Sequence, residues 1–125
     1  MVKIKIFFWR FMINVYGSIY MKYKQLIKFY YNKKIIVTGH TGFVGSWLSL
    51  ILSNYGSKVY GVSLKPNTKP NNFSILGIEN KIKKSFILNI LNKAALKKVF
   101  RKVKPDIVFH LAAQPYVIES LKNQR

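Results

Sequence analysis

The sequence predicts an α/β fold in which helices cover both faces of a parallel β-sheet. Two observations support this prediction. Short apolar runs, typical of buried strands, alternate with longer stretches whose apolar residues recur at helical spacing. In addition, the first apolar run enters a glycine-rich turn that opens directly into a helix. Strands that alternate with helices are joined by crossover connections, and such connections make neighbouring strands parallel.

The first predicted strand covers residues 34–38, a short apolar run bounded by glycine. A helix is expected over residues 43–55, because its apolar residues recur every three or four positions. Gly56 supplies the end of this helix. The second predicted strand covers residues 58–63, which completes a strand–helix–strand unit around the glycine-rich turn.

The second half of the chain continues the same alternation. Residues 64–72 contain two prolines and three asparagines and are expected to form a loop. Residues 73–76 suit a single helical turn, and residues 83–88 suit a third strand. A helix is expected over residues 92–103, with its first asparagine as the N-cap. The fourth predicted strand, residues 106–111, follows a proline, so the sheet is expected to hold four strands.

Residues 1–28 are expected to form an N-terminal extension, and residues 29–125 a single domain. The first twenty residues mix aromatic, aliphatic and basic side chains, but Arg10 and Asn14 interrupt the run of about 20 apolar residues that a transmembrane helix needs. Two interpretations stay open. The segment is either an extension without structure of its own, with Met21 as the working start, or a membrane-interfacial segment.

Basic residues far outnumber acidic ones, with 22 Lys and Arg against 3 Asp and Glu and a formal net charge of +19. Such a charge attracts nucleic acid and anionic lipid. A general compositional drift toward Lys, Asn, Ile, Tyr and Phe produces the same surplus without a binding role. We therefore expect neither a nucleic-acid nor a membrane partner, and keep a nucleic-acid-binding module built on the lysine-rich residues 81–104 as an alternative hypothesis.

Cysteine is absent from the chain, which rules out disulfides, thiolate metal ligands and cysteine nucleophiles. This composition suits a reducing compartment, so we expect a cytoplasmic location. No metal site is predicted. Half of the residues are hydrophobic, which is enough to build a core in a chain of 125 residues.

The main functional signal is the glycine-rich turn at residues 39–45, with glycines three positions apart between a strand and a helix. This arrangement offers backbone N–H groups and a helix N-terminus to a pyrophosphate. Gly39 permits the tight turn, Gly42 lets the backbone approach the phosphates, and Gly45 lets the helix lie against the strand. The sequence therefore predicts a nucleotide-cofactor site.

The stretch Val37-Thr38-Gly39-His40-Thr41-Gly42-Phe43-Val44-Gly45-Ser46-Trp47-Leu48 resembles the extended short-chain dehydrogenases/reductases. More narrowly it is similar to the CDP-glucose 4,6-dehydratases, in which a histidine follows the first glycine and Gly-Ser-Trp-Leu opens the helix. Residues 59–73, residues 104–115 and Ser120 match the same family in order, so the resemblance covers residues 29–123. It implies a Rossmann-like doubly wound parallel sheet, of which this chain holds the N-terminal βαβ units, with NAD as cofactor and a homodimer as the assembly.

The resemblance also implies which residues hold the cofactor. The turn would cradle the NAD pyrophosphate, the end of the third strand would contact the adenine, and the segment after the fourth strand would line the cofactor cleft. For Ala112 and Ala113, simple close packing is the competing explanation. The implied cofactor-binding residues are Gly39, Thr41, Gly42, Phe43, Val44, Gly45, Lys65, Asn89, Ile90, Ala112, Ala113 and Gln114.

Two positions depart from the family pattern. Lys65 stands where the family tends to have an aspartate that accepts a hydrogen bond from the ribose 2′-OH. A lysine cannot accept that bond but suits a 2′-phosphate, so the adenosine end binds NAD more weakly or the preference leans toward NADP. The second departure is Leu88-Asn89-Ile90-Leu91-Asn92 in place of Gly-Asp-Ile-Arg-Asp. Asn89 can still offer a carbonyl to the adenine amino group.

No catalytic residue is predicted in this chain. His40 and His110 have no carboxylate nearby in sequence, and we interpret both as structural or phosphate-adjacent. The resemblance implies a catalytic Tyr-x-x-x-Lys pair, and none follows the glycine-rich turn before Arg125. We therefore expect the N-terminal NAD-binding portion of a nucleotide-sugar 4,6-dehydratase that converts CDP-glucose to CDP-4-dehydro-6-deoxyglucose, inactive alone. The alternative within the same class is another NAD(P)-dependent sugar-nucleotide epimerase or dehydratase.

Overall fold

The computed structural model describes residues 17–112, which form one four-stranded sheet with helices on both of its faces. All three strand pairs are parallel, and the order across the sheet is β3-β2-β1-β4. The predicted doubly wound parallel sheet is therefore confirmed. The strands are β1 (Lys34–Thr38), β2 (Lys58–Ser63), β3 (Lys84–Ile87) and β4 (Ile107–His110).

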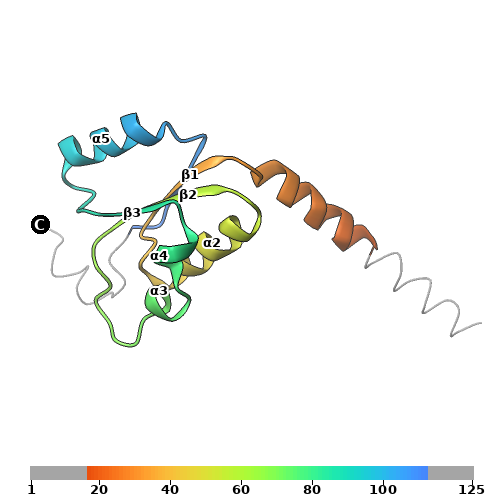
Figure 1. Cartoon of the computed structure of the whole chain (residues 1–125), viewed down its shortest axis with the longest axis horizontal. Coiled ribbons are helices and arrows are strands. Elements are labelled where there is room, and N and C mark those ends of the chain that lie inside the picture. The colour runs from red at the N-terminus through yellow and green to blue at the C-terminus, as the bar shows by residue number, and fades with distance from the viewer. Residues whose placement is uncertain (1–16, 113–125) are drawn as a thin grey trace, which may run out of the picture.

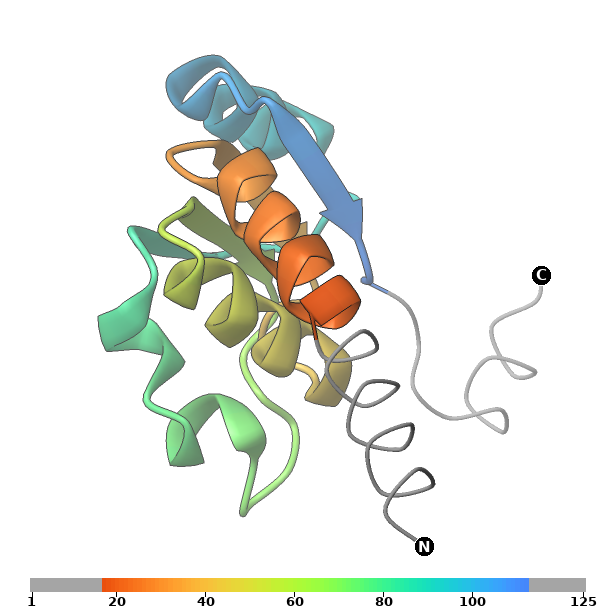
Figure 2. The ribbon, with the colours of Figure 1, turned by 90° about the vertical axis from the view of Figure 1, so that its right-hand side faces the viewer.

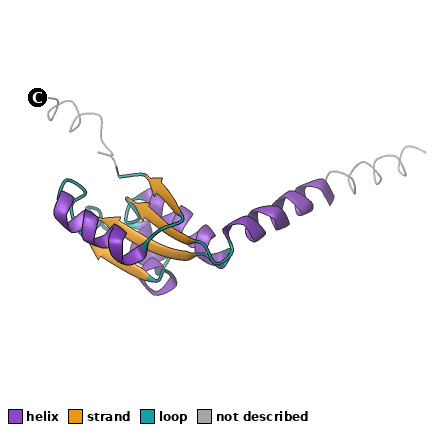
Figure 3. Ribbon diagram, turned by 90° about the horizontal axis from the view of Figure 1, so that it is seen from above, coloured by secondary structure: helices purple, strands orange, loops and turns teal. Residues whose placement is uncertain are grey.

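The helices lie in two layers. Figure 1 shows α2, α3 and α4 on one side of the sheet and α5 on the other. Figure 3 shows the same sandwich from above. Right-handed crossovers explain this arrangement. The connections from β1 to β2 and from β2 to β3 move in one direction across the sheet, and the connection from β3 to β4 moves back in the other direction, so its helix covers the opposite face. The helices are α2 (Phe43–Asn54), α3 (Asn72–Ile75), α4 (Ile78–Lys81) and α5 (Lys93–Val103).

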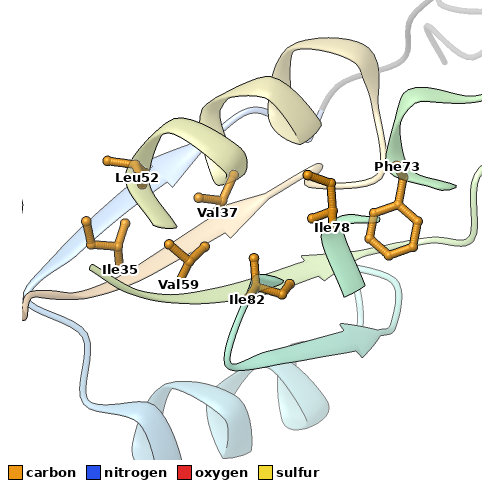
Figure 4. Close-up of a cluster of buried hydrophobic side chains, with 7 residues drawn as sticks. All are labelled: Ile35, Val37, Leu52, Val59, Phe73, Ile78 and Ile82. Carbon is orange, nitrogen blue, oxygen red and sulfur yellow. The ribbon is translucent and has the colours of Figure 1, made fainter. Parts of the chain in front are cut away.

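The core consists of two apolar clusters, one on each face of the sheet. Successive side chains of a strand point to opposite faces, so neighbouring residues of β1 enter different clusters. Figure 4 shows the cluster beneath α2–α4, which contains Ile35, Val37, Leu52, Val59, Phe73, Ile78 and Ile82. The cluster beneath α5 contains Ile36, Val62, Val99 and Val103.

Strand register brings the carboxyl ends of the strands together at one edge of the sheet. Thr38, the last residue of β1, lies opposite Val62 of β2 and His110 of β4. In open parallel sheets, ligands bind at this edge, outside the carboxyl ends of the strands and beside the turns that follow them. The fold thus places the glycine-rich turn at the expected binding edge.

The element ends agree closely with the sequence expectations. Asn92 caps α5 as predicted, because its Oδ1 accepts the N–H of Ala95 at 3.1 Å. The predicted helical turn at residues 73–76 is α3, displaced by one residue. The short helix α4 was not predicted, because four residues are too few to show a helical period.

Residues 17–30 form a helix, so the interpretation of the first twenty residues as an extension without structure does not hold for residues 17–20. This helix packs against the end of α2, where the rings of Tyr23 and Tyr55 lie 5.7 Å apart and those of Tyr30 and Tyr55 lie 6.3 Å apart. Figures 1 and 3 show it projecting away from the sheet, and Figure 2 shows it from its outer end. Residues 1–16 lie outside the described residues. Within residues 17–112, no helix has the length and apolar character needed to cross a bilayer.

Candidate functional site

The glycine-rich turn closes so tightly that two of its glycines leave no room for a side chain. Gly39 has φ 75°, and a Cβ there would lie 2.8 Å from the carbonyl carbon of Leu111. A Cβ on Gly45 would overlap the carbonyl oxygen of Gly39. Gly42 is less crowded, since the nearest atom to its Cβ position is the Gly39 oxygen at 3.3 Å. These contacts bear out the steric roles predicted for Gly39 and Gly45.

The turn presents the N-terminus of α2 without any capping group. Gly42 is the N-cap, no side chain caps the helix, and its first turn carries no acid. The first N–H groups of a helix have no acceptor within it, and together they carry a partial positive charge. Phe43 and Val44 are 71% and 61% exposed, so this end is open to solvent. An uncapped, open helix N-terminus is a favourable place for a phosphate.

A cavity of about 240 Å³ lies between the turn and the loop that follows β2. Its lining combines apolar surface from Phe43 and Pro70 with the amide side chains of three asparagines. The Nδ2 of Asn72 is buried and makes no hydrogen bond within the described part of the chain, so its two N–H donors have no acceptor there. The cavity is lined by Thr41, Gly42, Phe43, Asn67, Thr68, Pro70, Asn71 and Asn72.

The asparagine-rich wall of this cavity was not among the residues predicted for the site. Asn71 shapes it, because its Nδ2 donates to the carbonyl of Thr68 at 3.0 Å and its Oδ1 accepts the N–H of Ser74 at 2.9 Å. The sequence held one signal that could have indicated this wall. Three asparagines lie close together in the loop after β2, and that loop starts at the edge of the sheet where ligands bind. Asn67 and Asn72 belong to the same loop.

Thr41 joins the turn to the end of β2. Its hydroxyl donates to the carbonyl of Leu64 at 2.9 Å, and its oxygen lies 2.8 Å from the Ser63 hydroxyl, which donates in return. The side chain is buried and already satisfied, so any contact of Thr41 with phosphate falls to its backbone N–H. The bond to Leu64 ties the turn to the start of the loop after β2, which carries the exposed Lys65.

His40 is completely buried, although it lies in the turn between two glycines. Its Nε2 lies 2.7 Å from the Ser85 hydroxyl, and its ring meets the ring of Phe73 edge-on with centroids 5.4 Å apart. Burial lowers the pKa of the imidazole from 6.5 to about 4, a shift that the backbone of Val62 partly opposes. The ring is therefore uncharged at neutral pH, which agrees with the structural interpretation of this histidine.

The end of β4 is tied to the end of β1 through Thr38. The Oγ1 of Thr38 lies 2.8 Å from Nδ1 of His110 and accepts the backbone N–H groups of Leu111 at 3.1 Å and Ala112 at 3.2 Å. Ala112 is thereby held against Gly39, as close packing at this position requires. Ala113 and Gln114, also predicted for the cleft, lie outside the described residues.

The two residues predicted near the adenine lie after β3 and differ in their surroundings. Asn89 is exposed, but its Oδ1 accepts the N–H of Leu91 at 2.9 Å, which leaves one lone pair for a ligand. Ile90 packs against the apolar cluster beneath α5. The structure therefore leaves Asn89 available for a ligand, while Ile90 serves the core.

The charge distribution suits an anionic ligand. Within residues 17–112 the acids are Glu79 and Asp106, and neither lines the cavity. Asp106 accepts the N–H of Lys34 at 2.8 Å, at the opposite edge of the sheet where β1 begins. No described carboxylate thus stands against a phosphate at the turn.

Comparison with known proteins gives a consistent result. The family model described as NAD dependent epimerase/dehydratase family matches residues 35–125. The chain is 45% identical over 89 residues to CDP-glucose 4,6-dehydratase of Salmonella typhimurium, covering 71% of this chain and 24% of that protein. It is 35% identical over 92 residues to dTDP-D-glucose 4,6-dehydratase of Dictyostelium discoideum, covering 72% of this chain and 21% of that protein. The chain thus spans about a quarter of the length of these relatives.

Solved structures match the fold as well. The crystal structure of UDP-glucose 4-epimerase from Bifidobacterium longum, in complex with NAD⁺ and UDP, superposes with a TM-score of 0.59 at 26% identity. The match covers 70% of this chain and 27% of that one. The described sheet and helices therefore correspond to part of an enzyme that binds a dinucleotide.

Proposed function

This chain belongs to the NAD dependent epimerase/dehydratase family, and from that premise we propose that it binds the adenosine and pyrophosphate part of NAD. The observation that carries the proposal is the uncapped, solvent-open N-terminus of α2 at Gly42, which borders the cavity. Bound NAD supplies a hydride acceptor. The residues of this chain bind and orient it.

Each part of the site has a distinct task in this proposal. The first N–H groups of α2 and the turn hold the pyrophosphate, since a helix N-terminus favours negative charge. Asn89 uses its remaining lone pair for the adenine amino group, and Lys65 lies where the ribose 2′ position is read in dinucleotide folds.

We further propose that the whole protein is a nucleotide-sugar 4,6-dehydratase acting on CDP-glucose. The support is the 45% identity to an enzyme of that name, together with the histidine that follows the first glycine. Because the chain spans 24% of that relative, the sugar site and the catalytic residues are proposed for the segments that correspond to the remainder of the relative.

Three finer statements belong to the same proposal. The site takes NAD, the assembly is a homodimer, and the location is cytoplasmic. The sugar nucleotide is the substrate partner of the complete site. Each of these rests on family resemblance and composition.

A substitution at Gly42 tests the cofactor site, and the added Cβ requires only a small shift of the Gly39 carbonyl, 3.3 Å away. Gly42 has φ −78° and ψ 175°, an extended conformation that any residue adopts. Gly42→Asp places a carboxylate at an N-cap, which stabilises helices, directly against the site proposed for the pyrophosphate. We expect the Asp variant to keep its Tm and to bind NADH at least tenfold more weakly, measured by NADH fluorescence.

Gly42→Ala is the matched control, because it adds the same Cβ without the charge. The proposal requires the Asp variant to bind markedly more weakly than the Ala variant. Equal NADH affinity in the two variants, or no binding of NADH by the unaltered chain, would overturn it.

A further inference from the structure

The imidazole of His40 lies across β2 and leaves no room for a side chain beneath it. A Cβ built on Gly61 would overlap Cγ and Cδ2 of the His40 ring. Gly61 pairs with Val37 on one side and with Ser85 on the other. The ring from the turn therefore occupies the space that a side chain at position 61 would fill.

The contacts of the ring are directed into the protein. Nε2 lies 2.7 Å from the Ser85 hydroxyl on β3, and the ring meets the Phe73 ring of α3 edge-on. The backbone of the same residue is held by α2, because its carbonyl accepts the Ser46 hydroxyl at 3.0 Å. A ring enclosed in this way, without net charge, does not reach a phosphate in the cavity.

We propose that His40 is the positioning residue of the phosphate-binding turn, and that packing on Gly61 and the contact with Ser85 hold its ring in place. This inference rests on the proposed function. The residues on either side of His40 are Gly39 and Thr41, so a displacement of its backbone moves the N–H groups on both sides. The side chain fixes those groups in the conformation that the cofactor needs, before the cofactor arrives.

The physical argument is one of pre-organisation. Gly39 and Gly42 have many accessible conformations because they lack a side chain, and a turn rich in glycine loses much conformational freedom when it binds. Anchoring the one bulky residue between them restricts the turn in the free protein. The entropy lost on binding then becomes smaller, and the affinity rises.

The test uses the 125-residue chain with His40→Ala, Ser85→Ala and His40→Gln. Val99→Ala is the control, since Val99 is a buried residue of α5 and has no part in the turn. All measurements are made well below the Tm of each variant. The readouts are the Kd for NADH and the hydrogen exchange of two amides in the turn, Gly39 N–H, which donates to Val62, and Gly42 N–H, which donates to Gly39.

We expect His40→Ala to raise the Kd for NADH about tenfold, the factor that corresponds to one lost hydrogen bond and its ordering effect. Ser85→Ala should raise it less, and His40→Gln, which keeps an amide that reaches Ser85, should recover part of the loss. Exchange of the two turn amides should accelerate in parallel. Val99→Ala should lower the Tm and leave both the Kd and the turn amides unchanged.

If His40 had only a structural role, His40→Ala would lower the Tm and leave the Kd for NADH and the exchange of the turn amides unchanged, as Val99→Ala does. That result would overturn the inference. Failure of the unaltered chain to bind NADH is a separate outcome, because it overturns the proposed function. In that case the exchange of the turn amides still decides whether His40 orders the turn.

Discussion

The hydroxyl of Thr38 donates its proton to Nδ1 of His110 across 2.8 Å. The direction follows from the other contacts, because the same oxygen accepts backbone N–H groups from Leu111 and Ala112 and has only two lone pairs. Nδ1 is then an acceptor, and the neutral ring carries its proton on Nε2. One side chain thus joins the ends of β1 and β4 and sets the tautomer of a histidine.

Replacement of Thr38 by valine should destabilise the fold by about 2–3 kcal/mol, since the oxygen that serves three partners is lost while the shape is kept. Urea unfolding measures the change. Thr38→Ser, which retains the hydroxyl, should cost less than half as much. Equal losses in the two variants would contradict the assigned role of the oxygen, and nitrogen chemical shifts of His110 report the tautomer directly.

Lys65→Asp should strengthen NAD binding and weaken NADP binding. The aspartate can accept the ribose 2′-OH, and it repels a 2′-phosphate. We expect the ratio of the Kd for NADP to the Kd for NAD to rise by about tenfold or more, measured by competition with NADH. Lys69→Asp makes the same change of charge in the same exposed loop and serves as the control. A similar change in the ratio for both variants would show that overall charge, and not position 65, governs the preference.

Acid should destabilise the fold through His40. The pKa is about 4 in the folded protein and 6.5 in the unfolded chain, so the unfolded chain binds more protons between these values. Stability is therefore complete above about pH 6.5 and falls as the pH decreases toward 4, by about 3 kcal/mol at most. Urea midpoints between pH 8 and pH 4.5 measure this slope. The His40→Gln variant should lose most of it, and an unchanged slope in that variant would contradict the assignment.

Much of the fold could be predicted because its signals are local. The strand–helix alternation, the glycine spacing and the Asn92 cap each depend on residues close together in the sequence. The N-terminal helix could not be predicted in this way, because Tyr23 and Tyr30 pack on Tyr55, which lies more than twenty residues further along the chain. Such contacts are invisible until the fold is assembled.

The site shows the same division. The roles of Gly39 and Gly45 follow from their spacing, and the structure agrees with them. The engagement of the Thr41 hydroxyl by Leu64 and the free donor of Asn72 depend on how the loop after β2 folds back on the turn. A pattern of residue types cannot reveal which of several polar side chains is already satisfied by another part of the protein.

Because the His40 ring fills the space beside Gly61, the residues tolerated at these two positions depend on each other. A larger residue at position 61 is compatible only with a smaller one at position 40, so each codon limits what the other can encode. Evolution at this site must proceed through paired exchanges or through a small residue at both positions. In a library randomised at both codons, the fraction of folded proteins would therefore differ from the product of the folded fractions found when each codon is randomised alone.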